Sequence, residues 1–168
     1  KYDFYAKGGI ILATGGFGAN AAMVKKYNPS LDERFKTTDA PGTTGEALYM
    51  AQKAGAELVN MQYIQTYPIC DPISGVIELI ADARFDGAIL INQEGKRFVE
   101  ELQRRDVISH AILNQPGSYC YVLWNDNIGK ISNTVKAHPE EYETFTKQGV
   151  MHTADNLKEV ADFFKIPY

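Results

Sequence analysis

A short apolar run with a glycine turn behind it constrains the fold of this chain more than any other stretch. The run is GAILIN, residues 87–92, whose aliphatic residues predict a buried strand. Residues 93–95 predict a tight turn, and KRFVEE, residues 96–101, is expected to return as the partner strand. A helix is expected over residues 106–115. The stretch therefore predicts a β-hairpin that leads into a helix.

The remaining elements mix helices and strands without a regular alternation, which predicts an α+β fold. Residues 43–56 form the clearest helix, with Thr43 and Glu46 at capping-box spacing and Gly55 at its end. The other predicted elements are a strand at 8–14, a short helix ending at Tyr27, an extended segment at 56–68, a strand at 118–125, and helices near 126–135, 139–147 and 155–164.

Charge, apolar runs and cysteines exclude several classes of function. The 168 residues carry a net charge of −4, so the chain lacks the basic surface that nucleic-acid binding requires. No apolar run reaches the roughly 18 residues of a membrane span. Cys70 and Cys120 fit no metal-binding spacing and are expected to be free thiols, and the 3 histidines also lack such spacing. We therefore expect no metal site.

Two glycine-rich turns are candidates for cofactor contact. ILATGGFG follows the first predicted strand, but its G-G-x-G spacing differs from the G-x-G-x-x-G of dinucleotide-binding folds. PGTTGEAL brings Gly42 and Gly45 to a helix start, where backbone N–H groups can bind an anion or a polar group. An ordinary strand–turn–helix and a plain capped helix explain the same residues, so both alternatives stay open.

Five polar side chains lie on segments that can converge: Tyr67, Glu78, Asp82, Arg84 and Arg105. Two guanidinium groups in one pocket suit a carboxylate, because their N–H groups match its two oxygens. Arg105 begins a predicted helix, where the helix dipole is already positive. Surface ion pairs, each contributing about 0 to 1 kcal/mol, are the alternative. Spacing alone does not decide between the two, and the rarity of functional sites among charged residues favours the ion pairs.

Five stretches follow one another in the order found in a known family. They are ATGGFGAN, NPSL, PGTTGEAL, AGAELVNMQYIQTYP and GAILINQEGKRFVEELQRRD. This order resembles that of the soluble fumarate-reductase-type flavoproteins, including the flavin subunit of flavocytochrome c. The resemblance extends from about residue 8 to about residue 160, and GAILIN-x-EGKRFV-x-E-x(3)-RD is its most specific part.

The resemblance implies a two-domain flavoprotein with its active site between an FAD-binding domain and a mobile capping domain. Residues 1–20 resemble a terminal strand and glycine turn of the FAD-binding domain, and residues 21–168 resemble the α+β capping, or substrate-clamp, domain. We therefore expect a piece of a larger flavoprotein that neither holds FAD well nor turns over alone. The expected partners are the remaining FAD domain and an electron donor, which can be haem, covalent FMN or a free flavin carrier.

The resemblance also implies a reaction and its residues. Family members reduce α,β-unsaturated carboxylates: the flavin delivers hydride to one alkene carbon, and an arginine protonates the other. Alignment of the RD pair makes that arginine Arg105, leaves Arg104 dispensable, and matches Arg84 to a relay arginine. The residues expected to contact FAD are Thr14, Gly15, Gly16, Gly45, Glu46 and Gln65.

Two departures from the fumarate-reducing pattern concern the substrate. Ala81 stands where the family has a relay glutamate, with Asp82 next to it, and Tyr67 stands where a histidine binds a fumarate carboxylate. An aspartate repels a second carboxylate but accepts a hydrogen bond from an imidazole N–H. Tyr67 and Asp82 resemble the urocanate-reducing members, so we predict a urocanate reductase. The alternatives are a reductase of fumarate or another acrylate, and a non-catalytic binding module.

Overall fold

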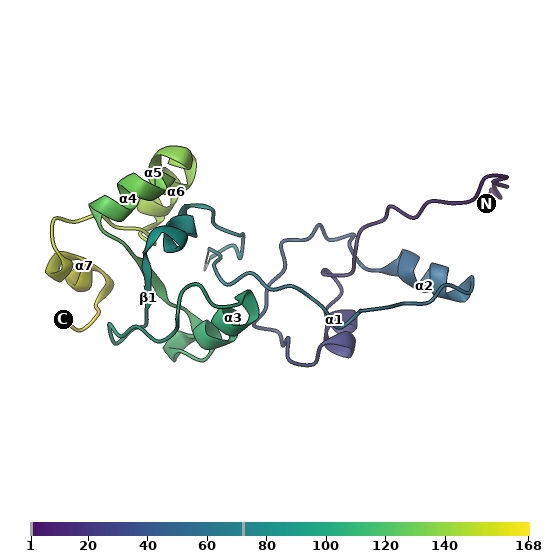
Figure 1. Cartoon of the computed structure of the whole chain (residues 1–168), viewed down its shortest axis with the longest axis horizontal. Helices are drawn as coiled ribbons and strands as arrows, with labels where there is room; N and C mark the ends of the chain where they lie inside the picture. Colours follow the sequence, from purple (N-terminus) through teal and green to yellow (C-terminus); the bar gives the residue numbers. More distant parts are fainter. Residues whose placement is uncertain (1, 72) are drawn as a thin grey trace. The chain divides into compact units, whose positions relative to one another are not determined.

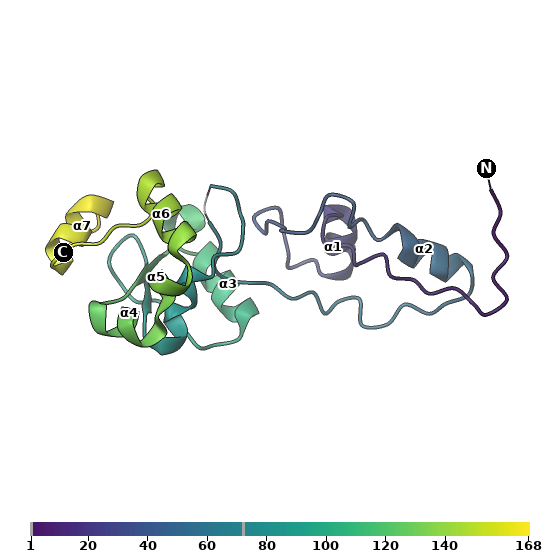
Figure 2. The same cartoon turned by 90° about the horizontal axis from the view of Figure 1, so that it is seen from above.

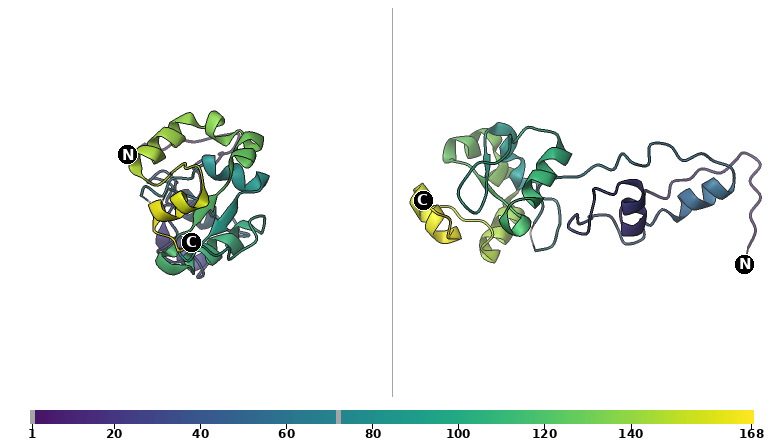
Figure 3. Two further views of the ribbon diagram at one scale, coloured as in Figure 1. Left: turned by 90° about the vertical axis from the view of Figure 1, so that its left-hand side faces the viewer. Right: turned by 90° about the horizontal axis from the view of Figure 1, so that it is seen from below.

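The computed structural model describes residues 2–71 and 73–168, and the chain divides into two compact units, Lys1–Ile64 and Gln65–Tyr168. The first unit is mostly irregular chain with two short helices, α1 (Ala21–Tyr27) and α2 (Glu46–Lys53) (Figure 1, Figure 3). The Asn20 side chain caps α1 by accepting from the N–H of Met23 at 3.0 Å. Both predicted helices of this unit are confirmed.

Two predictions for the first unit differ from the structure. The strand expected at residues 8–14 is not formed among the described residues, because no other described segment pairs with it. Ile10 and Ile11 accordingly remain 80% and 93% exposed. The capping box expected from Thr43 is wrong: Gly45 is the N-cap of α2, with φ +77° and no side-chain cap.

The second unit contains one antiparallel strand pair, β1 (Ile89–Ile91) and β2 (Tyr121–Leu123), with Leu90 opposite Val122. The turn after β1 is confirmed, since the N–H of Asn92 donates to Lys96 O at 2.9 Å. The return strand at 96–101 is wrong, because only Ile91 and Arg97 form a bridge there. The Leu90 N–H donates instead to the Glu101 carboxylate at 2.9 Å. This hydrogen bond occupies the backbone donor that a third strand would need for pairing with β1.

Helices are the predominant regular elements of the second unit (Figure 2). They are η1 (Ile80–Asp86), α3 (Arg105–Leu113), η2 (Pro116–Ser118), α4 (Asp126–Ser132), α5 (Thr134–Ala137), α6 (Pro139–Gln148) and α7 (Leu157–Phe164). The four predicted helical regions are confirmed, whereas the 3₁₀ helix η1 was not anticipated. A helix-rich unit with a small sheet agrees with the predicted class at this level. No described helix is long and apolar enough to cross a membrane.

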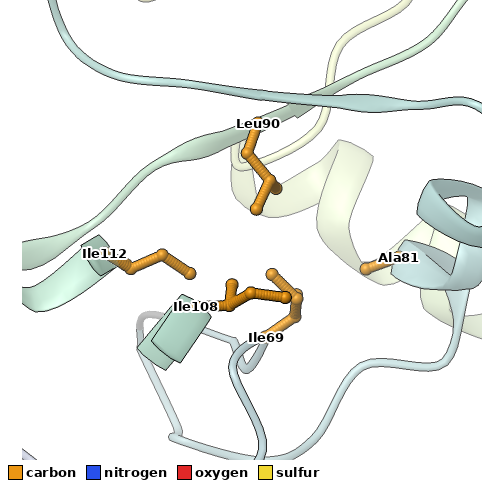
Figure 4. Close-up of a cluster of buried hydrophobic side chains, with 5 residues drawn as sticks. All are labelled: Ile69, Ala81, Leu90, Ile108 and Ile112. Carbon is orange, nitrogen blue, oxygen red and sulfur yellow. The ribbon is translucent and has the colours of Figure 1, made fainter. Parts of the chain in front are cut away.

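A small apolar core holds the elements of the second unit together. Its members are Ile69, Ala81, Leu90, Ile108 and Ile112, and Figure 4 shows Leu90 pointing from β1 toward the isoleucines. These residues come from the segment before η1, from η1 itself, from β1 and from α3. The core therefore fixes the segments that carry Tyr67, Asp82 and Arg105, each of which lies within three residues of a core member.

Candidate active site

Tyr67 and Asp82, the two predicted substrate-binding residues, contact each other. The Tyr67 hydroxyl donates to Asp82 Oδ1 at 2.9 Å. Tyr67 is held because Pro68 and Ile69 behind it are buried. Asp82 is half-buried between Ala81 and Ala83, both of which are buried in η1. Tyr67 and Asp82 are 15 residues apart in the sequence, and the buried residues next to each of them bring the two side chains into contact.

Burial and two neighbouring side chains set the proton affinity of Tyr67. Burial raises the pKa of Tyr67, the hydrogen bond and the charge of Asp82 raise it further, and Arg84 acts in the opposite direction. The hydroxyl therefore keeps its proton at neutral pH and serves as a hydrogen-bond donor. Its position beside both Asp82 and Arg84 links these two side chains of η1.

Arg84 is a buried cation that retains an unused donor. Its residue is 3% exposed, and Nη1 donates to the backbone carbonyl of Glu101 at 2.9 Å. The guanidinium carbon lies 4.2 Å from the centre of the Phe85 ring. Nε is buried with no hydrogen-bond partner among the described residues. Because an unpaired buried donor is costly, Arg84 is suited to bind a further acceptor.

Arg105 opens α3 and lies beside Tyr67. Its guanidinium carbon is 5.1 Å from the centre of the Tyr67 ring, in cation–π geometry, and the side chain belongs to an exposed residue. Ser109 Oγ donates to the Arg105 carbonyl at 2.8 Å and lies 3.3 Å from Thr66 Oγ1. These contacts join α3 to the segment that carries Tyr67. The structure thus brings all four predicted catalytic and substrate residues together in one unit.

Glu78, the fifth polar side chain singled out from the sequence, belongs to a different environment. Burial raises its pKa to about 7, and the charges of Asp71 and Glu141 add to the effect. Glu78 therefore lies in an acidic cluster with Asp71 and Glu141. No described group of three or more His, Cys, Asp or Glu side chains has the geometry of a metal site.

The glycine turns expected to contact FAD lie side by side within the first unit. The Ala19 N–H donates to Thr43 O at 3.0 Å, and Asn20 Nδ2 donates to Thr44 O at 2.9 Å. A Cβ on Gly15 would approach Thr43 Cγ2 to 3.7 Å, and one on Gly45 would clash with Met23 Sδ at 2.7 Å. Both glycines have positive φ, +76° and +77°, so each turn requires glycine.

This arrangement fits a bound cofactor. Thr14, Gly15 and Gly16 are exposed, and Glu46 is the exposed first residue of α2. Glycine turns of this kind let backbone N–H groups approach a polar cofactor group closely. Gln65, the remaining predicted contact, is an exposed residue at the start of the second unit.

A family profile described as the FAD binding domain matches residues 1–166. The chain belongs to this family. FAD is therefore the cofactor of the flavoprotein to which this chain belongs, as predicted for the full-length protein, and its relatives are flavin-dependent reductases.

Curated relatives of this chain bear the names of several reductases. It is 42% identical over 166 residues to urocanate reductase from Eggerthella lenta, a match covering 98% of the chain and 27% of the relative. It is 42% identical over 148 residues to fumarate reductase (cytochrome) from Shewanella frigidimarina, covering 88% and 24%. NADH:acrylate oxidoreductase from Vibrio harveyi is 36% identical over 162 residues, covering 95% and 16%.

A solved structure gives the same picture. The open conformation of a flavocytochrome c3 fumarate reductase matches with a TM-score of 0.70 and 26% identity, covering 91% of this chain and 26% of the other. The chain thus spans about a quarter of the length of the urocanate reductase, the cytochrome-linked fumarate reductase and this solved chain.

Three residues that support the site were missed by sequence reasoning. Glu101 lies in the most specific motif, so its place there was a usable signal. Glu141 and Thr134 lie in α6 and α5, outside every motif, and nothing in the local sequence distinguishes them.

Proposed function

We propose that this chain belongs to an FAD-dependent reductase that reduces the C=C bond of an α,β-unsaturated carboxylate, with urocanate as the substrate. The observation that carries the proposal is the hydrogen bond from Tyr67 to Asp82 beside Arg84 and Arg105. The relatives named for urocanate, fumarate and acrylate support the class of reaction. We assign residues 1–20 to the FAD-binding domain and residues 21–168 to the capping domain.

The cofactor and the chain divide the chemistry between them. The residues that would hold FAD in part are Thr14, Gly15, Gly16, Gly45, Glu46 and Gln65. When bound, the cofactor would supply the hydride that one alkene carbon receives. Arg105 stabilises the negative charge that develops next to the carboxylate and delivers a proton to the second carbon. Such charge stabilisation is commonly the largest contribution to catalysis.

A guanidinium is a very weak acid, so Arg105 needs rapid reprotonation after it gives up a proton. Arg84 is the candidate relay group, since it is buried and keeps an unpaired Nε–H. Ala81 has no side-chain group that can transfer a proton, so the hydrogen-bonded Tyr67 and Asp82 are the side chains that can continue the relay. This assignment replaces a relay glutamate by a tyrosine–aspartate pair.

Asp82 supports urocanate over fumarate. A carboxylate has about four lone-pair sites, so Asp82 can accept from Tyr67 and from an imidazole N–H at the same time. A second carboxylate in that place would be repelled by Asp82. The acrylate end of urocanate would meet the guanidinium groups, which match a carboxylate.

The test uses the full-length, FAD-loaded protein with a reduced viologen dye as electron donor. We expect fast dye oxidation with urocanate and slow oxidation with fumarate. Fast turnover of fumarate alone would overturn the substrate assignment and leave the reaction class intact. Two other outcomes would overturn the roles given to Tyr67 and Asp82. One is no turnover of either urocanate or fumarate, and the other is turnover of an aryl acrylate but of neither of these two acids.

A further inference from the structure

The start of η1 is held by a side chain from a distant helix. Glu141 of α6 accepts two backbone hydrogen bonds through Oε2, from the Ile80 N–H at 2.7 Å and from the Leu79 N–H at 3.1 Å. Ile80 and Leu79 precede Glu141 by 61 and 62 positions in the chain. Leu79, the N-cap residue of η1, makes no side-chain cap of its own. Glu141 therefore provides the N-terminal cap that η1 lacks locally.

Thr134 of α5 holds the other side of the same residue. Its Oγ1 donates to the carbonyl of Ile80 at 2.7 Å, and Thr134 is only 3% exposed. Glu141 and Thr134 thus bind both the N–H and the C=O of Ile80. A 3₁₀ helix has poor hydrogen-bond geometry and little stability of its own, so such outside contacts decide where it lies.

The restrained residue is two positions from Asp82 and four from Arg84. The Asp82 N–H donates to Leu79 O at 3.0 Å, which connects the clamped turn to the Tyr67–Asp82 pair. We propose that Glu141 and Thr134 are positioning residues, which fix η1 so that Asp82 and Arg84 meet Tyr67 in the geometry that selects the substrate. This inference rests on the function proposed above.

The size of the effect follows from how catalysis depends on distance. A displacement of reacting groups by about 1 Å can cost about 100-fold in rate. A loosened η1 shares its time between correct and displaced positions, so a smaller loss, about tenfold in kcat/KM for the preferred acid, is expected. Discrimination between acids should fall with it, because Asp82 is the group that distinguishes them.

The experiment compares two pairs of variants in the full-length, FAD-loaded protein. Glu141→Ala and Thr134→Val remove the contacts with Ile80, whereas Glu141→Gln and Thr134→Ser retain an acceptor and a donor. Glu140→Ala is the matched control, because Glu140 is an exposed carboxylate next to Glu141 in the same helix. The readouts are KM and kcat for urocanate and fumarate, FAD content, and hydrogen exchange of peptides covering residues 78–86.

Support requires faster exchange over residues 78–86 and lower kcat/KM and discrimination in Glu141→Ala and Thr134→Val, with normal FAD content. Glu141→Gln, Thr134→Ser and Glu140→Ala should stay within about threefold of the parent, as expected when a neutral acceptor or donor preserves the hydrogen bond. Unchanged kinetics despite faster exchange would overturn the positioning role. The positioning role would also be overturned if activity fell only in proportion to the FAD content in all four variants of Glu141 and Thr134.

The result is separable from the test of the proposed function. If the parent protein reduces neither urocanate nor fumarate, the proposed function fails. The exchange measurement then still reports whether Glu141 and Thr134 hold η1, and it needs no substrate.

Discussion

Arg104 Nη2 lies 2.7 Å from Asp106 Oδ2, so the carboxylate that follows the two adjacent arginines pairs with the first of them. Both side chains of this pair are well exposed. Arg105 turns instead toward the Tyr67 ring, at 5.1 Å. The helix start therefore carries one arginine neutralised by its neighbour and one directed at the candidate substrate-binding residues.

This division predicts losses of very different size for two neighbouring substitutions. Arg105→Ala should lower kcat with urocanate by about 100-fold or more, the range expected for loss of an acid–base group. Arg104→Ala is the control and should lower kcat less than about fivefold, because the Arg104–Asp106 ion pair is exposed and contributes little. Dye-linked turnover of both variants measures the difference. Equal losses would contradict the assignment of Arg105.

The Tyr67–Asp82 pair predicts a change in substrate preference. Asp82→Asn removes the charge and should lower kcat/KM for urocanate by about 10- to 100-fold, since hydrogen bonds to charged groups contribute about 1.5 to 3 kcal/mol. Fumarate should gain relative to urocanate, because repulsion of its second carboxylate is lost. Competition between the two acids in one assay measures the ratio. Tyr67→Phe, which removes only the donor, should change it less.

Local patterns predicted most of the helices, and non-local contacts explain what was missed. The sequence indicated α3 within one or two residues of its observed limits, Arg105–Leu113, because periodicity and capping are local signals. The partner of β1 was predicted wrongly because the Glu101 side chain, rather than a strand, binds the Leu90 N–H. The helix η1 was not predicted because residues from α5 and α6 hold it.

The candidate site shows the same limit. The family resemblance selected Tyr67, Asp82, Arg84 and Arg105, and the structure brings them together. Before the resemblance is considered, the rarity of functional sites among charged residues favours surface ion pairs here, yet Arg84 is buried and donates to a backbone carbonyl. Burial of a charged side chain depends on residues far along the chain, so charge patterns alone do not reveal it.

The contacts of Glu101 predict that its replacement destabilises the chain more than replacement of its exposed neighbour Glu100. Its carboxylate, 4% exposed, accepts from the Leu90 N–H and from Arg97, and its carbonyl accepts from Arg84. Glu101→Ala leaves the buried Leu90 N–H unpaired, which should cost about 2 kcal/mol and lower Tm by about 4 to 8 °C. Glu100→Ala is the control and should change stability by less than about 0.5 kcal/mol. Similar melting curves for the two variants would contradict the role of Glu101.

Glu78 predicts how stability changes with pH. Burial, with Asp71 and Glu141 nearby, raises its pKa in the folded chain to about 7 from the ordinary 4.5. Below pH 4.5 the carboxyl is protonated in both states and costs nothing. As pH rises from 4.5 to about 7, the unfolded chain ionises first, so stability falls and then levels off above about 7.

Replacing this carboxyl by an amide isolates its effect. A shift of this size corresponds to about 3 kcal/mol between the two protonation states, and water around the half-buried group screens it to about 1 kcal/mol. Glu78→Gln should therefore raise Tm at pH 8 by about 2 to 4 °C and leave it unchanged at pH 4. Glu143→Gln, on the exposed part of α6, serves as the control. A gain that is equal at both pH values would mean that packing, rather than ionisation of Glu78, changes the stability.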